Sequence, residues 1–199
     1  MTRLALFAYG SLVSPASAAL TLGRPVEVAA LARLRGWRRR WSVCRDNRAS
    51  EKTFAPAGGG EPYRWCLGLN IEPIDAEPAA LEGPNGALIE VSEAELGRLD
   101  LRELRYDRVE VTAEIASDDP LPELTAIYAW TAKPRHHSPA PPDGAVIMAT
   151  YHAAVERAFA ELGAEQLELF RATTEAPPVE LADGVLVRDL IPAGNPREW

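Results

Sequence analysis

The order of the apolar segments constrains the fold of this chain more than any other feature. Short apolar runs bounded by turn residues occur up to about residue 130, and the longest amphipathic helix pattern, at 145–162, comes late. Strands grouped ahead of a long helix are typical of α+β proteins, whereas doubly wound sheets alternate strands with helices. The sequence therefore predicts an α+β fold.

The individual elements follow from local patterns. Apolar runs and alternation predict strands, while a serine–proline pair and a capping box predict helix starts. We expect strands at 4–9, 26–43 (one strand, or two with a bend at Gly36), 63–71, 86–91, 108–115, 125–130 and 185–187. We expect helices at 15–22, 92–100, 145–162 and 167–173, and loops rich in glycine or proline at 45–62, 72–84 and 134–144.

Length and composition fit one domain, or one domain with a helical annex. Hydrophobic residues make up 47% of the 199 residues, which is enough for a sizeable core. We predict a unit built mostly of strands at 1–133, and a linker, a helix and a tail at 134–199 that pack on the same domain. The formal net charge of −8 predicts no affinity for nucleic acid or for anionic membranes.

The cysteines and the first residues indicate the compartment. Two cysteines, Cys44 and Cys66, do not make a disulfide framework. The apolar run within the first seven residues is too short for a signal peptide, and no window approaches the roughly 20 apolar residues of a membrane span. We expect a cytoplasmic protein.

One segment is strongly basic, although the net charge of the chain is negative. It consists of Arg33, Arg35, Arg38, Arg39 and Arg40. Such a run either forms a solvated strand face, with guanidiniums covering apolar surface, or binds an anion. The sequence leaves both interpretations open.

The first candidate functional segment is Tyr9-Gly10-Ser11-Leu12, at the end of the first predicted strand. A strand that ends at glycine can turn sharply and leave consecutive backbone N–H groups unpaired. Such groups bind a carboxylate or a developing oxyanion. The same residues also fit an ordinary strand-to-helix turn.

Glu103 is the second candidate. It lies in a mixed-charge segment, where most acids are surface carboxylates, but its neighbours Leu101, Leu104 and Tyr106 favour lower exposure. A carboxyl group in an apolar pocket has a raised pKa and accepts a proton near neutral pH. Glu103 is therefore a candidate general base.

Other common catalytic patterns are missing from the sequence. His136 and His137 are adjacent in a proline-rich loop and His152 lies on a predicted helix, so the histidines do not predict a metal site. The glycines at 58–60 lack the Lys-Ser/Thr of a P-loop. The serines at 11–17 lack the G-x-S-x-G nucleophile elbow.

The segments described above together resemble the γ-glutamylcyclotransferase-like superfamily, including its glutathione-degrading ChaC branch. Residues 7–12 resemble the family's N-terminal Y-G-S-L substrate loop, and 34–41 resemble the arginine-rich strand that follows it. The strand at 86–91 leads into a short helix, as it does in the family. The match covers residues 4–130.

Glu103 falls three residues after Asp100, where the family keeps its catalytic glutamate, and Tyr106 falls near its usual tyrosine. One departure concerns the residues that follow. The family often has glycine soon after the glutamate, whereas Leu104-Arg105 leads directly to the tyrosine here. This shorter segment bears on the substrate more than on the chemistry.

The resemblance implies a small mixed β-barrel with flanking helices and a pocket at one mouth. The implied reaction is intramolecular aminolysis of a γ-glutamyl compound, which releases 5-oxoproline and an amine or peptide, with Glu103 as general acid/base and no metal or organic cofactor. The implied substrate-binding residues are Tyr9, Gly10, Ser11, Leu12 and Tyr106.

The sequence leaves several alternatives open. It does not choose among glutathione, γ-glutamyl amino acids, γ-glutamylamines and γ-glutamyl intermediates of secondary metabolism, or indicate an oligomeric state. The altered segment after Glu103 is also compatible with a non-catalytic module that binds a γ-glutamyl or other acidic metabolite. The proline-rich segments at 134–142 and 175–196 would also suit an interaction protein with an incidental pocket.

Overall fold

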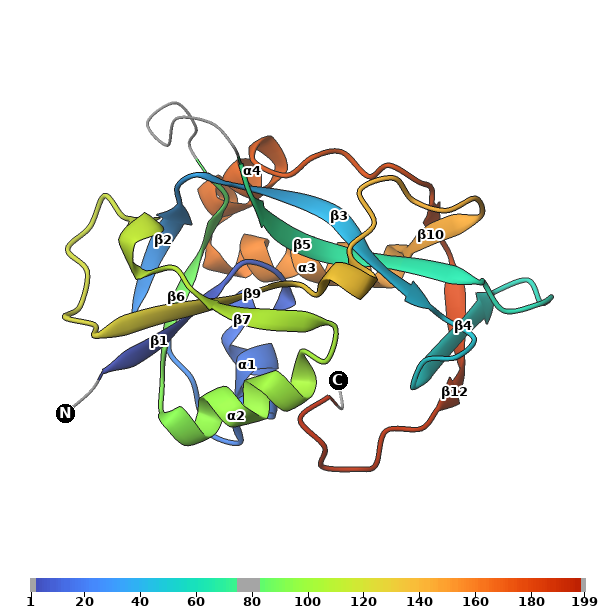
Figure 1. Ribbon diagram of the computed structural model, residues 1–199, viewed down its shortest axis with the longest axis horizontal. Coiled ribbons are helices and arrows are strands. Elements are labelled where there is room, and N and C mark those ends of the chain that lie inside the picture. Colours follow the sequence, from blue (N-terminus) through green and yellow to red (C-terminus); the bar gives the residue numbers. More distant parts are fainter. Residues whose placement is uncertain (1–2, 75–82, 198–199) are drawn as a thin grey trace.

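Three sheets and four α-helices make up residues 3–74 and 83–197, the part of the chain that the computed structural model describes (Figure 1). The six-stranded sheet has the order β7 (Tyr106–Glu110), β9 (Ala126–Ala132), β1 (Leu4–Ala8), β6 (Asn85–Val91), β2 (Ala30–Leu34) and β8 (Ile115–Ala116). The four-stranded sheet has the order β11 (Leu181–Ala182), β10 (Ala145–Met148), β5 (Trp65–Pro73) and β3 (Trp37–Asp46). A two-stranded ribbon pairs β12 (Gly184–Asp189) with β4 (Lys52–Pro56).

The two larger sheets meet where β5 lies beside β9, and together they curl into a half-barrel (Figure 1). Side chains join them at this seam. The Thr131 hydroxyl donates to the Ile71 carbonyl at 2.7 Å, and the Ala132 N–H donates to Asn70 Oδ1 at 2.8 Å. The α+β class and the curled sheet expected from the sequence are confirmed.

Strand β1 lies in the interior of the six-stranded sheet, and all five of its residues are buried. It pairs antiparallel with β6 and parallel with β9. A strand with neighbours on both edges and cover on both faces is expected to be continuously apolar, as 4–8 is. The segment at residues 9–12 therefore follows an interior strand of the sheet and not an edge strand.

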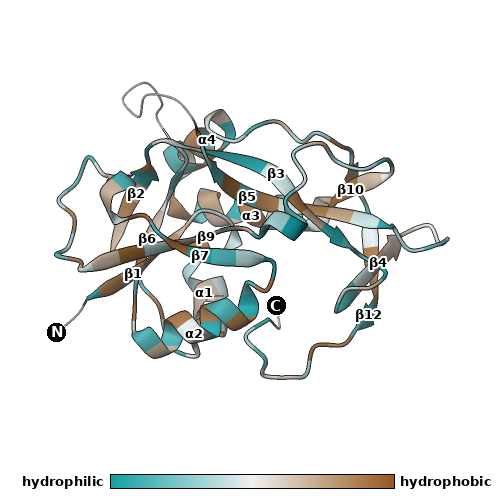
Figure 2. Ribbon diagram, in the orientation of Figure 1, coloured by the Kyte–Doolittle hydropathy of each residue, from teal (hydrophilic) through white to brown (hydrophobic). Residues whose placement is uncertain are grey.

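The helices are α1 (Pro15–Leu22), α2 (Glu93–Arg102), α3 (Ala149–Leu162) and α4 (Ala164–Ala172). Helices α1 and α2 pack against each other, and so do α3 and α4, where the rings of Phe159 and Phe170 stack at 4.5 Å between centroids. Figure 2 shows α2 banded in hydrophilic and hydrophobic colours, and its buried residues Leu96 and Leu99 face the core. Short 3₁₀ turns form at Ser11–Val13 (η1), Thr112–Glu114 (η3) and Pro134–His136 (η4).

Three sequence predictions are wrong in their details. The helix predicted from 145 begins at Ala149, because the buried apolar residues of β10 pair in parallel with β5. The strand predicted over 108–115 ends at Glu110, since Thr112 Oγ1 accepts the N–H of Ile127 and the chain turns into η3. The loop predicted at 45–62 contains β4, whose partner β12 is distant in sequence.

The other predicted elements are confirmed within a few residues of their bounds. The segment at 26–43 forms two strands that meet near Gly36, whose φ of 77° requires a left-handed conformation. Residues 75–82 of the predicted loop at 72–84 lie outside the described residues. No helix in the described ranges is both long enough and apolar enough to cross a bilayer.

Candidate active site

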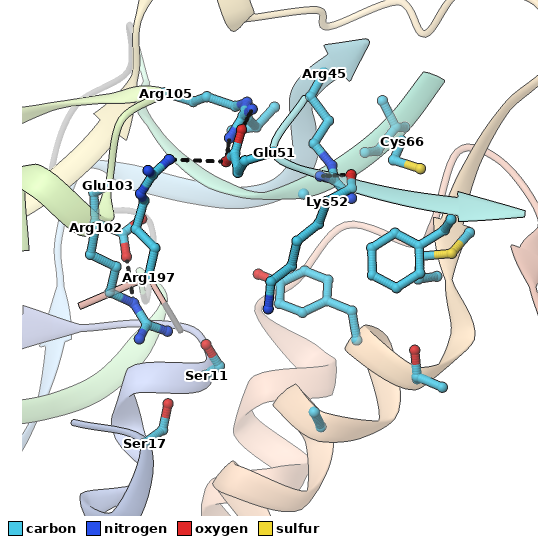
Figure 3. Close-up of a pocket in the computed structure, with 18 of the residues that line it drawn as sticks. Ser11, Ser17, Arg45, Glu51, Lys52, Cys66, Arg102, Glu103, Arg105 and Arg197 are labelled. Atoms are coloured by element: carbon cyan, nitrogen blue, oxygen red, sulfur yellow. Dashed lines mark hydrogen bonds and ion pairs between the residues drawn. The ribbon is translucent and has the colours of Figure 1, made fainter. Parts of the chain in front are cut away.

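Two adjoining cavities bring the predicted site residues together. The smaller, of about 60 Å³, is lined by all six of them: Tyr9, Gly10, Ser11, Leu12, Glu103 and Tyr106. The larger, of about 640 Å³, shares Ser11, Glu103, Tyr106 and Tyr151 with the smaller one (Figure 3). Glu103 therefore lies where a small inner hollow meets a large outer cavity.

Glu103 is held by a tight turn between α2 and β7. Its N–H donates to the Leu99 carbonyl at 2.8 Å, and its own carbonyl accepts the N–H of Tyr106 at 2.9 Å. Helix α2 starts at a capping box formed by Ser92 and Glu95, as the sequence predicted. The backbone at Glu103 is thus fixed from both sides, which orients its side chain.

The Glu103 carboxylate is mostly buried, with 20% of its side chain exposed, and it accepts one hydrogen bond, from Arg102 Nε at 3.1 Å. Burial raises the pKa of Glu103 above its ordinary value, while the positive charge of Arg102 opposes that rise. A carboxylate whose pKa lies above its ordinary value accepts a proton more readily near neutral pH. Glu103 thus has the environment of a general base.

Three tyrosines surround this carboxylate. The Tyr9 hydroxyl donates to the Trp130 carbonyl at 2.6 Å, and the Tyr106 hydroxyl donates to the Leu69 carbonyl at 2.7 Å. Burial raises the pKa of both phenols well above the ordinary value and raises the pKa of Tyr151 to about 12. All three phenols therefore stay neutral at physiological pH and add no negative charge beside Glu103.

The loop after β1 presents unpaired backbone donors. The carbonyls of Gly10 and Ser11 accept hydrogen bonds from Val13 and Ser14 as the chain turns through η1. The N–H groups of Gly10, Ser11 and Leu12 donate to no described residue. These three residues line the small hollow that Glu103 also lines, so the donors predicted from the sequence belong to the same cavity as the acid.

Arg39 anchors that loop from behind. It is fully buried, and its guanidinium donates to the Tyr9 carbonyl at 3.2 Å and to the Asn85 carbonyl at 2.7 Å. It also contacts the rings of Phe159 and Phe170. Burial lowers the pKa of Arg39 to about 9, so the group remains charged at neutral pH.

The arginine run therefore does not form a single solvated face. Arg38 and Arg40 pair with Glu72 at 3.1 Å and 3.6 Å, whereas Arg39 points into the core. Because the Arg39 donors are bound to groups of the chain itself, it is not an anion site either. Arg39 therefore fits neither a solvated strand face nor an anion site, the two interpretations that the sequence left open. Successive residues of a strand point to opposite faces, so Arg39 lies on a different face of β3 from Arg38 and Arg40.

A second charged cluster borders the larger cavity. Arg105 donates to both carboxylate oxygens of Glu51 at 2.8 Å and 2.7 Å, and Arg197 lies 3.6 Å from the same carboxylate. Hydrogen bonding from Arg105 lowers the pKa of Glu51 to about 2. Figure 3 shows this cluster on the same side of the cavity as Glu103 and Arg102, with Cys66 on the other side.

Sequence reasoning missed several residues of the cavities. Tyr151 was identified only as part of the apolar face of a helix, although a phenol on such a face is a usable signal. Arg102 precedes Glu103 directly, and its pairing with the acid is visible only in three dimensions. Nothing in the sequence indicated that Glu51 and Arg197 meet, because 146 residues separate them.

Comparisons with known proteins show the fold of the chain. No protein-family model matches the sequence, and no curated protein does. An uncharacterized protein from Homo sapiens superimposes with a TM-score of 0.58 at 16% identity, over 89% of this chain and 90% of that one. A structure described as a gamma-glutamyl cyclotransferase gives 0.55 at 15% identity, over 90% and 94%.

The Bacillus subtilis protein YkqA gives a TM-score of 0.52 at 17% identity, and the match covers 88% of this chain but only 57% of YkqA. These likenesses span nearly the whole of this chain, including the part after residue 133. The chain therefore has the fold of a γ-glutamyl cyclotransferase, as the sequence resemblance implied.

Proposed function

We propose that this protein is a γ-glutamyl cyclotransferase that releases 5-oxoproline and an amine or peptide from a γ-glutamyl compound. The observation that carries the proposal is the shared cavity of Glu103 and the loop of residues 9–12. The partly buried carboxylate and the unpaired N–H groups come from segments far apart in the sequence. The shared fold supports the same reaction class.

In this mechanism the glutamyl carboxylate lies in the small hollow, and the γ-amide lies where the two cavities meet. Glu103 removes a proton from the substrate's α-ammonium, and the free amine attacks the γ-carbonyl carbon to form the new C–N bond. The oxygen gains negative charge, which the N–H groups of residues 10–12 stabilise. As the old C–N bond breaks, the departing nitrogen takes that proton from Glu103. The new ring nitrogen then gives its second proton to the Glu103 carboxylate, which passes it to the released amine, so neutral lactam and an ammonium product form and Glu103 is again a carboxylate.

The energetics agree with these roles. An α-amine has a pKa of about 8 and a free glutamate about 4.3, so proton transfer across that gap costs about 5 kcal/mol. Burial of Glu103 raises its pKa and narrows the gap. A positioned base contributes about 10²–10⁴-fold, and one oxyanion donor contributes about 3–4 kcal/mol.

The decisive experiment uses a panel of γ-glutamyl compounds that includes glutathione, γ-glutamyl amino acids and γ-glutamylamines. The protein is incubated with each compound, and 5-oxoproline is measured. Glu103→Gln should lower its release by at least about 10²-fold. The melting temperature should remain close to that of the wild type, because Gln keeps the shape of the side chain.

Asp107→Asn is the matched control. Asp107 follows Glu103 closely, but its side chain is 55% exposed, so this substitution should leave turnover unchanged. An active Glu103→Gln protein would remove Glu103 from the mechanism. Saturable heat in calorimetry without any product from the wild type would instead support a binding module.

A further inference from the structure

The C-terminal segment 184–197, here called the tail, forms part of the wall of the large cavity. Three of its side chains line that cavity: Leu186, Ile191 and Arg197. Strands β3, β4 and β10 contribute apolar side chains to the same cavity, namely Val43, Phe54 and Met148. Among the charged residues that also line the large cavity, such as Arg45 and Arg157, apolar side chains from these strands and from the tail therefore form one part of its wall.

Hydrogen bonds hold the tail against β4, the other strand of the two-stranded ribbon, and against the residues before it. Strand β12 pairs antiparallel with β4, and Arg188 donates to Thr53 Oγ1 at 3.1 Å and to the Arg48 carbonyl. Beyond the strand, the N–H of Leu190 donates to the Glu51 carbonyl at 2.9 Å. These bonds keep the tail over the cavity along the length of β12.

The end of the tail is tied to the same acid. The guanidinium of Arg197 lies 3.6 Å from the Glu51 carboxylate, which Arg105 also holds. Arg105 lies two residues after Glu103, so the tail meets the segment that carries the proposed base. The register of the ribbon also shifts between Leu186 and Arg188, and such a bulge re-aims nearby side chains.

We propose that the tail forms the leaving-amine subsite and selects γ-glutamyl compounds whose amine half carries a bulky apolar group. This inference rests on the proposed function, which places the amine half in the large cavity. Leu186 and Ile191 provide the apolar contact, and Arg197 fixes the far end of the wall. A small leaving amine does not reach these side chains and is not affected by them.

The test compares γ-glutamyl-leucine with γ-glutamyl-glycine as substrates of the full chain. The measured quantity is the ratio of their kcat/KM values for 5-oxoproline release. Ile191→Ala should lower the leucine-to-glycine ratio about tenfold, because apolar contacts of this size contribute about one order of magnitude in selectivity. The value for γ-glutamyl-glycine should stay unchanged.

Ile191→Trp gives a second, independent test by adding volume to the same wall. It should reduce turnover of γ-glutamyl-leucine while sparing γ-glutamyl-glycine. Leu190→Ala is the matched control: Leu190 is an adjacent apolar residue, 63% exposed, that does not line the cavity. Its substitution should leave both substrates unchanged.

The possible outcomes separate the two proposals. Product from both substrates with an unchanged ratio in both Ile191 variants overturns the role of the tail alone. Absence of product from every γ-glutamyl compound of the panel in the wild type overturns the proposed function and the subsite with it, whereas product from other panel members but from neither dipeptide overturns the subsite alone. An altered ratio in the Ile191 variants, with Leu190→Ala like the wild type, supports the tail as the selective wall.

Discussion

Arg39 and Glu103 are both charged groups inside the protein, but they differ in how fully the protein hydrogen-bonds them. Arg39 is fully buried and donates six hydrogen bonds within the chain. Within residues 3–74 and 83–197, Glu103 accepts a single hydrogen bond, from Arg102, and its side chain lines a cavity. One charge is fully solvated by protein groups, and the other is not.

The difference distinguishes a charge that is fully hydrogen-bonded within the fold from a charge that is left available for proton transfer. Burying a charge costs free energy unless hydrogen bonds replace those lost to water. Arg39 recovers that cost through hydrogen bonds to the loop at residues 9–12, to β6 and to α4, so its removal should affect folding. Glu103 remains poorly solvated, which raises its pKa and lowers stability but favours proton transfer.

The largest effect on stability is expected from Arg39→Met. This substitution leaves the Tyr9 and Phe170 carbonyls and the Asn85 side chain without their donor, so it should cost about 3 kcal/mol. For a chain of this size that lowers the melting temperature by about 6–12 °C. Thermal unfolding followed by circular dichroism measures the change.

Arg38→Met is the control for this prediction. Arg38 is the preceding residue of the same strand, but its side chain is 43% exposed, and its buried partner Glu72 is also held by Ser42, His137 and Arg40. Because water screens the exposed guanidinium and Glu72 keeps these other partners, the loss should be about 0–1 kcal/mol. Equal effects of the two substitutions would contradict the structural role assigned to Arg39.

A smaller effect on stability, together with a change in the pH dependence of activity, is expected from Arg102→Met. Arg102 opposes the rise in the pKa of Glu103, so removing it should raise that pKa further. Since a base acts in its deprotonated form, activity rises with pH through this pKa, and the acidic limb of the kcat/KM profile should move to higher pH. We expect about a three- to tenfold loss at acidic pH that alkaline pH restores.

Arg98→Met tests whether this shift is specific to the charge beside Glu103. Arg98 also lies on α2 and donates to the Thr21 carbonyl, while Arg102 donates to the Thr21 hydroxyl. Both variants lose an anchor to α1, but only Arg102 touches Glu103. A shift of the pH profile in both variants, or in neither, would contradict the mechanism.

Local patterns were sufficient for most of the fold. The continuous apolar run at 4–8 and the capping box at Ser92 specify their elements without distant partners. Strand β4 was missed because its stability depends on pairing with β12, which no local pattern shows. The start of α3 was misplaced because four buried apolar residues satisfy a strand and a helix equally well.

In the candidate site, too, local motifs could be predicted from the sequence and contacts between distant segments could not. Glu103 and the loop at residues 9–12 were predicted from short motifs, and the structure brings them to one hollow. Arg39 was misread because burial depends on which face of β3 turns inward, and a run of arginines gives no alternation from which to infer it. The meeting of Glu51 with Arg197 depends on the path of the whole tail.

The smallest effect is expected from Ser92→Ala, at the other end of the helix that carries Glu103. Ser92 Oγ accepts the Glu95 N–H at 3.3 Å, and its loss should cost about 1 kcal/mol and lower the melting temperature by about 2–4 °C. Activity at 25 °C should stay within about twofold, because the backbone of Glu103 is fixed locally by Leu99 and Tyr106. Ser92→Asp, which restores a cap, is the control for stability. If activity fell while this control kept it, the position of Glu103 would depend on the whole of α2, and the contrast with Arg39 would weaken, since both charges would then depend on distant packing.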